Sequence, residues 1–107
     1  MPARAYPRVV HHAAQLLGAE IRAGRTERGW TVAQLAERAG ISEKTVRAVE
    51  HGGLGVAIGT VFDCAVLVGV PLFYEDEQRL ATEAERARVV LNRRVRRSKP
   101  ADVDLDF

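Results

Sequence analysis

The sequence predicts an all-α protein, and three observations carry that prediction. Apolar residues recur at helical spacing in five stretches of the chain, capping residues precede two of these stretches, and glycine or proline follows most of them. We expect a compact unit of four or five helices, followed by an additional C-terminal helix and a charged tail. By residue number, the expected parts are 1–74, 75–91 and 92–107.

The helix with the clearest start signal begins at about Thr31. Thr31 and Gln34 have the spacing of a capping box, in which each side chain bonds the other residue's backbone N–H, and Trp30 can pack over Leu35 as a hydrophobic staple. Gly40 ends this helix, because glycine accepts the left-handed backbone that closes a helix with a sharp change of direction.

A second short helix is expected from Glu43 to about Glu50. Ser42 is its N-cap candidate, and Ile41 is placed to pack onto Val46. The residues left facing outward are short and mostly polar: Glu43, Lys44, Thr45, Arg47, Ala48 and His51. A helix of this size fits the major groove of DNA, where its first residues meet base edges. An ordinary helical hairpin in a bundle is the plainer alternative for this motif, residues 31–52.

Helices are also expected on both sides of this motif. Before it, helical spacing links Leu17, Ile21 and Arg25, although Gly18 and Gly24 each cost about 1 kcal/mol relative to alanine inside a helix. The segment from residue 7 to residue 12 adds a turn or a short helix. After the motif, one apolar face contains Ile58, Val61, Phe62, Ala65 and Val68, and Gly69 is a stop signal.

The stretch from Gln34 to Gly52, and LAERAGIS and TVRAVEHG within it, resembles the Cro/phage-repressor (XRE) family of helix-turn-helix proteins. The resemblance extends over roughly residues 16–71. It implies a compact repressor-type fold and a double-stranded DNA operator, which a homodimer reads at palindromic half-sites. Carried onto this chain, the residues expected at DNA are Thr31, Ser42, Glu43, Lys44, Thr45, Arg47, Ala48 and His51.

The family also implies a structural ion pair, which falls here on Arg25 and Glu50. Such a pair would set the angle of the reading helix. Two positions depart from the family pattern. Val32 stands where a phosphate-binding glutamine is common, and Glu43 leads the reading helix, where it would repel phosphate but could accept a hydrogen bond from cytosine.

Composition limits what else the chain can do. With 107 residues, of which 47% are hydrophobic, it can build one modest core. Three histidines and a single cysteine, Cys64, show no metal-ligand spacing, and neither a phosphate-binding loop nor a nucleophile beside a base is present. We therefore expect no enzyme activity, no metal and no cofactor. Because apolar runs are far shorter than the roughly 20 residues of a spanning helix, we expect a cytoplasmic protein without a membrane partner.

The formal net charge is only +2. Between Glu20 and His51, six basic side chains meet five acidic ones. Since non-specific affinity for DNA comes from neutralising phosphates, one such domain should bind weakly. Two half-sites, a basic arm or both would be needed.

The C-terminal helix, residues 75–91, starts with acidic residues, which are favourable at a helix N-terminus. Its apolar stripe consists of Leu80, Ala84, Ala87 and Leu91. This stripe either packs on the chain's own domain or forms a surface for a dimer or a partner.

The tail, residues 92–107, is basic and then acidic. Its basic block is a candidate DNA arm and contains Arg93, Arg94, Arg96, Arg97 and Lys99. Its acidic and apolar end is a candidate docking peptide and contains Asp102, Asp104, Leu105, Asp106 and Phe107. A solvated tail with self-cancelling charge is the third alternative.

Two functions follow from the resemblance. One is a stand-alone, dimeric (auto)repressor. The other is a HipB-like antitoxin, which binds its own promoter and also sequesters a HipA-like kinase toxin, as the small size and the LDF ending suggest. A neighbouring kinase-like reading frame would favour the antitoxin. A pure protein-interaction module, with the same fold but without DNA, is a third class.

Overall fold

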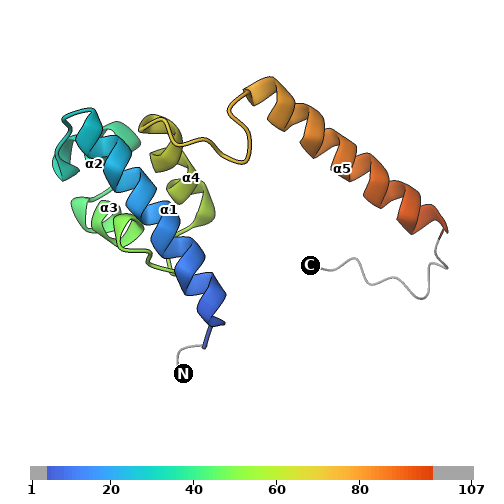
Figure 1. Cartoon of the computed structure of the whole chain (residues 1–107), viewed down its shortest axis with the longest axis horizontal. Coiled ribbons are helices and arrows are strands. Elements are labelled where there is room, and N and C mark those ends of the chain that lie inside the picture. Colours follow the sequence, from blue (N-terminus) through green and yellow to red (C-terminus); the bar gives the residue numbers. More distant parts are fainter. Residues whose placement is uncertain (1–4, 98–107) are drawn as a thin grey trace. The chain divides into compact units, whose positions relative to one another are not determined.

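The structure is a computed structural model that describes the backbone of residues 5–97 and the side chains of residues 5–94. The chain divides into two compact units after Leu72. Four helices belong to the first unit and one helix to the second (Figure 1). The all-α prediction is confirmed for the part of the chain that is described.

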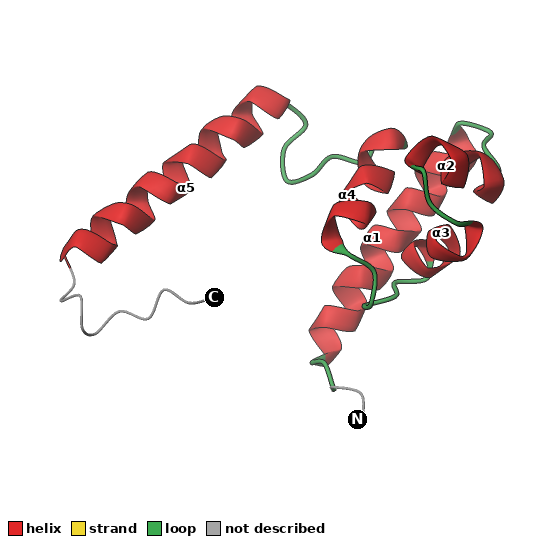
Figure 2. Ribbon diagram, turned by 180° about the vertical axis from the view of Figure 1, so that it is seen from behind, coloured by secondary structure: helices red, strands yellow, loops and turns green. Residues whose placement is uncertain are grey.

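The four helices of the first unit surround one core (Figure 2). They are α1 (Arg8–Glu27), α2 (Val32–Ala39), α3 (Glu43–Glu50) and α4 (Ile58–Leu67). α1 packs against α3 and α4, while α2 packs against α3 and α4. The segment before residue 13 is the first part of α1 and makes no separate short helix, so the unit has four helices.

The core draws apolar side chains from every helix of this unit. The buried residues are Ile21, Leu35, Ala36, Val46, Val49, Cys64, Ala65 and Val68. Full burial of side chains of this kind stabilises the fold by about 1.5–3 kcal/mol each for the larger ones. The core therefore holds the two motif helices to α1 and α4.

The caps expected for the motif helices are present. The Thr31 hydroxyl accepts a hydrogen bond from the Gln34 backbone N–H at 3.1 Å, and the Gln34 side chain accepts one from the Thr31 N–H at 2.8 Å. Gly40 has φ 68° at the end of α2, in the left-handed region. The Ser42 hydroxyl accepts from the Thr45 N–H at 3.1 Å and so caps α3.

The two glycines inside α1 mark close approaches between backbones. A Cβ atom added at Gly18 would collide with the carbonyl oxygens of Val49 and Glu50 at the end of α3. A Cβ atom added at Gly24 would lie 2.6 Å from the carbonyl oxygen of Val68. The absence of a side chain at these two positions lowers the helix propensity of α1. It also allows α1 to lie directly against the ends of α3 and α4.

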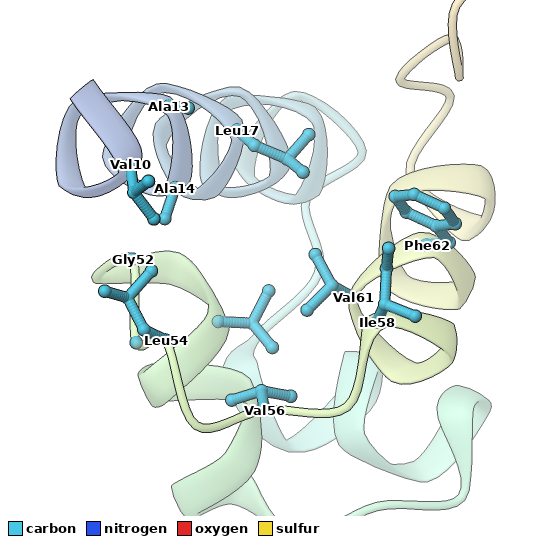
Figure 3. A pocket seen from close by; sticks show the side chains of 12 residues that line it. Val10, Ala13, Ala14, Leu17, Gly52, Leu54, Val56, Ile58, Val61 and Phe62 are labelled. Carbon is cyan, nitrogen blue, oxygen red and sulfur yellow. The ribbon is translucent and has the colours of Figure 1, made fainter. Parts of the chain in front are cut away.

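One residue of the expected α4 face is misplaced in the prediction. Ile58 is 69% exposed, whereas Ala65 and Val68 are buried as expected. Ile58 is the first residue of α4 and lines a shallow apolar groove of about 310 Å³, beside Leu54 and Val56 of the preceding loop (Figure 3). Helical periodicity predicts the correct face of α4 for Ile58. The side chain is nevertheless exposed, because α1 does not cover that end of α4.

The second unit contains α5 (Glu77–Arg97). The Asp76 carboxylate accepts a hydrogen bond from the Gln78 N–H at 2.9 Å, which satisfies one N–H of the first turn. The helix continues to Arg97, beyond the expected end at residue 91. Arginine is a good helix former and is favourable near a helix C-terminus, so the arginines from Arg93 to Arg97 extend the helix. No described helix is both long and apolar enough to span a membrane.

Candidate nucleic-acid interface

α3 buries one face and exposes the other. Val46 and Val49 lie in the core, while Glu43, Lys44 and Arg47 are exposed. α2 packs against α3 through the same core, so the position of the exposed face depends on buried contacts. Of the outward set expected from the sequence, Thr45 and Ala48 are half-buried, and His51 is exposed at the C-cap of α3.

Glu43 and Arg47 are paired on this exposed face. A nitrogen of the Arg47 guanidinium lies 3.2 Å from Glu43 Oε1, and both side chains are at least half exposed. A pair of this kind is worth only about 0.3–0.5 kcal/mol, so DNA can compete for the guanidinium. The described residues provide no ion pair for Lys44, which extends from the first turn of α3.

Local hydrogen bonds restrain three other residues that are expected at DNA. The Ser42 and Thr45 hydroxyl oxygens are 2.9 Å apart, so one hydroxyl donates to the other. His51 Nδ1 lies 2.7 Å from the Arg47 carbonyl oxygen, and because a carbonyl only accepts, Nδ1 donates. The ring's Nε2 remains for a second partner, as an acceptor in neutral histidine.

Arg25 and Glu50 form a buried, two-pronged ion pair. Arg25 Nε donates to Glu50 Oε2 at 2.6 Å, and a second guanidinium nitrogen donates to Oε1 at 3.1 Å. A third donates to the Trp30 carbonyl at 2.8 Å. The hydrogen bond to Glu50 raises the pKa of Arg25. The pair ties the end of α3 to α1 and to the residue before the α2 cap.

Trp30 has a role that the sequence indicated only in part. Its ring packs against the core, and the guanidinium of Arg38 lies 4.2 Å from the ring centroid. Arg28, on the other hand, donates to the Val68 carbonyl at 2.6 Å, where α4 ends. Two arginines that count as basic residues of the motif region therefore act within the fold. Val68, whose carbonyl is the partner of Arg28, is distant in sequence, whereas Trp30, the aromatic partner of Arg38, is near.

The start of α2 offers one polar side chain, Thr31, directly before the position where the XRE family commonly has a phosphate-binding glutamine. Thr31 is exposed, and its hydroxyl proton is available although its oxygen accepts the cap bond. Val32 is half-buried and packs against the core. Valine at this position therefore adds to the core and cannot replace the glutamine that is common in the resembling family.

The candidate basic arm and the reading helix belong to different units. Arg93 and Arg94 are exposed on α5, and the backbone of residues 96 and 97 is helical. Lys99 and the candidate docking residues, Asp102, Asp104, Leu105, Asp106 and Phe107, lie outside the described residues.

Away from α3, the described part of the first unit has one apolar groove and one buried thiol. The described residues include no group of three or more metal-ligating side chains. The apolar groove in Figure 3 has no titratable side chain in its lining. Burial, aided by the negative charges of Asp63 and Glu50, raises the pKa of the Cys64 thiol, which disfavours the reactive thiolate.

Comparison with known proteins agrees with this geometry. The family described as "Helix-turn-helix domain" matches residues 16–81, which is more than half of the chain. No curated protein and no solved structure matches. The matched range contains α2 and α3 with the buried contacts that orient them. This chain therefore belongs to the helix-turn-helix domain family, of the XRE/Cro-like type.

Proposed function

We propose that the protein is a sequence-specific transcriptional regulator that acts as a dimeric (auto)repressor. Each copy inserts the start of α3 into the major groove of one half of a palindromic operator. In this proposal Lys44 and Arg47 donate to guanine edges or phosphates, Glu43 accepts from cytosine, and Thr31 and Ser42 donate to phosphates.

The observation that carries the proposal is that α3 exposes a polar face while its opposite face is buried in the core. A reading helix must hold its orientation while its outer side chains stay available, and the Arg25–Glu50 pair with the core provides that support. Lys44 and Arg47 are exposed, and the half-buried Ala48 lies one helical turn beyond Lys44.

Repression would follow from occupancy. A dimer on its own promoter excludes polymerase from the same DNA, and the nearly balanced charge of the chain makes that occupancy depend on base contacts. Loss of specific contacts should therefore abolish regulation, because little non-specific affinity remains.

The test is a fluorescence-anisotropy titration of the full chain against DNA from its own upstream region and against a scrambled duplex, at two salt concentrations. We expect tight binding to the upstream DNA alone. Lys44→Ala and Arg47→Ala should each weaken it by about tenfold or more. Arg22→Ala is the matched control, since it removes one exposed arginine from α1, outside the motif. Equal, weak binding to both duplexes would contradict the proposal.

The antitoxin alternative depends on one further observation, the acidic and apolar ending of the sequence. In that function residues 102–107 would occupy a basic pocket of a HipA-like kinase toxin. Co-expression with a kinase-like product of the adjacent gene would test it. Recovery of a complex that is lost on deleting residues 102–107 would favour the antitoxin, and absence of any complex would leave the stand-alone regulator.

A further inference from the structure

The helix α5 carries a stripe that continues beyond its apolar centre. Successive steps of three and four residues connect the six positions of the stripe, which are Glu77, Leu80, Ala84, Ala87, Leu91 and Arg94. This is the spacing of a seam between two helices, in which each apolar residue inserts between residues of the facing helix. The two ends of the stripe carry opposite charges.

Acidic and basic residues are also separated along α5. Residues 77–85 contain three glutamates and one arginine, whereas residues 86–94 contain four arginines and no acidic residue. The single arginine of the first half, Arg79, lies over the ring of Tyr74, with 4.5 Å to its centroid. Two ion pairs, Glu83 with Arg86 and Glu85 with Arg88, join the halves at the middle.

The surface of the stripe has the shape of a docking face. A shallow hollow of about 370 Å³ lies around Ala87, and its other lining residues are the apolar Val90 and Leu91 and the charged Glu83, Arg86 and Arg94. Val90 and Leu91 are 43% and 45% exposed. Alanines at the centre of a helix seam allow two backbones to approach closely, and the flanking leucines then cover the contact.

We infer that α5 pairs with α5 of a second copy in antiparallel orientation. In that arrangement Leu80 lies opposite Leu91 of the second copy, and Ala84 lies opposite Ala87. The same register places Glu77 opposite Arg94 of the second copy, at both ends of the seam. The acidic half of each helix then faces the basic half of the other.

Charge makes a parallel pair of α5 helices less favourable than an antiparallel pair. A parallel pair in the same seam would oppose Glu77 with Glu77 and Arg94 with Arg94, and like charges in these layers are destabilising. The apolar layers are the same size in both orientations, so they do not distinguish them. The opposite charges at the stripe ends therefore determine the orientation.

This inference rests on the proposed function for its purpose, since it provides the dimer that a palindromic operator requires. Glu77 and Arg94 are about 26 Å apart along the helix, at about 1.5 Å per residue. The two starting points of α5 in the pair are separated by the same length. Half-sites lie about 34 Å apart on DNA, and the four residues between Leu72 and Glu77 on each side can span the difference.

The experiment is a charge-exchange series on the full chain, measured by sedimentation equilibrium without DNA. Glu77→Arg and Arg94→Glu should each weaken the dimer by about tenfold, because each creates two like-charge contacts in an antiparallel pair. The double variant, Glu77→Arg with Arg94→Glu, should recover the affinity. A parallel dimer would respond to neither single change, since each exchanges one like-charge layer for another. Leu91→Asp should abolish the dimer in either orientation.

Circular dichroism shows whether each variant keeps its fold. A wild type that stays monomeric at every concentration, a dimer that ignores Leu91→Asp, or one that ignores both single charge changes would each overturn the inference. DNA binding is measured separately on a duplex with a single half-site. Specific binding there by a wild-type chain that stays monomeric in sedimentation would overturn the α5 pair and leave the proposed DNA reading intact, whereas a stable wild-type dimer without specific binding would do the reverse.

Discussion

Arg25 and Glu50 come from helices that are far apart in the sequence, yet their contact determines how the reading helix is held. Both side chains are nearly buried, and each of the two bonds between them connects α1 with the last residue of α3. A buried pair gives little net stability when compared with apolar residues of similar size. Its value here is the fixed geometry between α1, Trp30 and α3.

Removing one member of this pair should lower the free energy of unfolding. Glu50→Leu leaves the Arg25 guanidinium buried without its carboxylate, so we expect the free energy of unfolding to fall by about 3–5 kcal/mol. Arg25→Met with Glu50→Leu should cost clearly less than Glu50→Leu alone, since no buried charge remains. Urea denaturation followed by circular dichroism measures both. Equal losses in the two variants would show that the pair is not electrostatically coupled.

The pair of Glu43 and Arg47 should limit binding to DNA of any sequence. Glu43→Ala frees the guanidinium of Arg47 and removes a negative charge from the interface, so we expect tighter binding to a scrambled duplex. The dependence of log K on log salt should steepen by up to about 0.9, the value for one further phosphate. Glu20→Ala is the matched control, because it removes an exposed glutamate of α1. If both variants bind alike, net charge alone explains the change.

At the scale of elements, α1 works as the support for α3 and α4. Its glycines face the ends of α3 and α4, and its own end is tied to α4 through Arg28. The cost of glycine in a helix is offset by contacts that no other residue permits. Helix propensity and packing therefore disagree at Gly18 and Gly24, and packing decides.

Gly18→Ala should destabilise the protein, although alanine is the better helix former. The added methyl group meets backbone carbonyls of α3, which cannot move as a side chain can, so we expect a loss of about 1–3 kcal/mol. Gly59→Ala is the matched control. It lies in α4 with open space around the position of the new Cβ, and it should be neutral or stabilising by up to about 1 kcal/mol. Thermal unfolding of both variants tests this, and a stabilised Gly18→Ala protein would contradict the close approach.

At the scale of the whole molecule, the chain divides after Leu72 into two units, and our proposals assign DNA reading to the first and dimerisation to the second. The first unit has its own core and all the residues of the reading face. A fragment of residues 1–72 should therefore fold cooperatively. We expect it to bind a single half-site as tightly as the full chain, but to lose the advantage that the full chain has on a palindrome. Anisotropy titrations on half-site and palindromic duplexes measure this, and a fragment that does not fold would show that the units depend on each other.

Local signals explain why so much of the first unit could be predicted. Thr31, Gln34, Gly40 and Ser42 act on neighbours within four residues, so their caps can be recognised in the chain itself. The expected ends of α2 and α3 follow from them. The sequence predicts the end of α5 too early. The arginines after Leu91 resemble a charged tail, but they are good helix formers and belong to the helix.

The sequence by itself determined the all-α class, the two motif helices and the exposed positions Glu43, Lys44 and Arg47, because capping and helical periodicity are short-range properties. Only the tertiary structure decided why Gly18 and Gly24 stand in α1, that Ile58 lies at an open groove, and that Arg28 and Arg38 act within the fold. Each of these depends on a neighbour from another part of the chain. The physical reason is that backbone approach and burial arise from packing between helices, which periodicity within one helix does not specify.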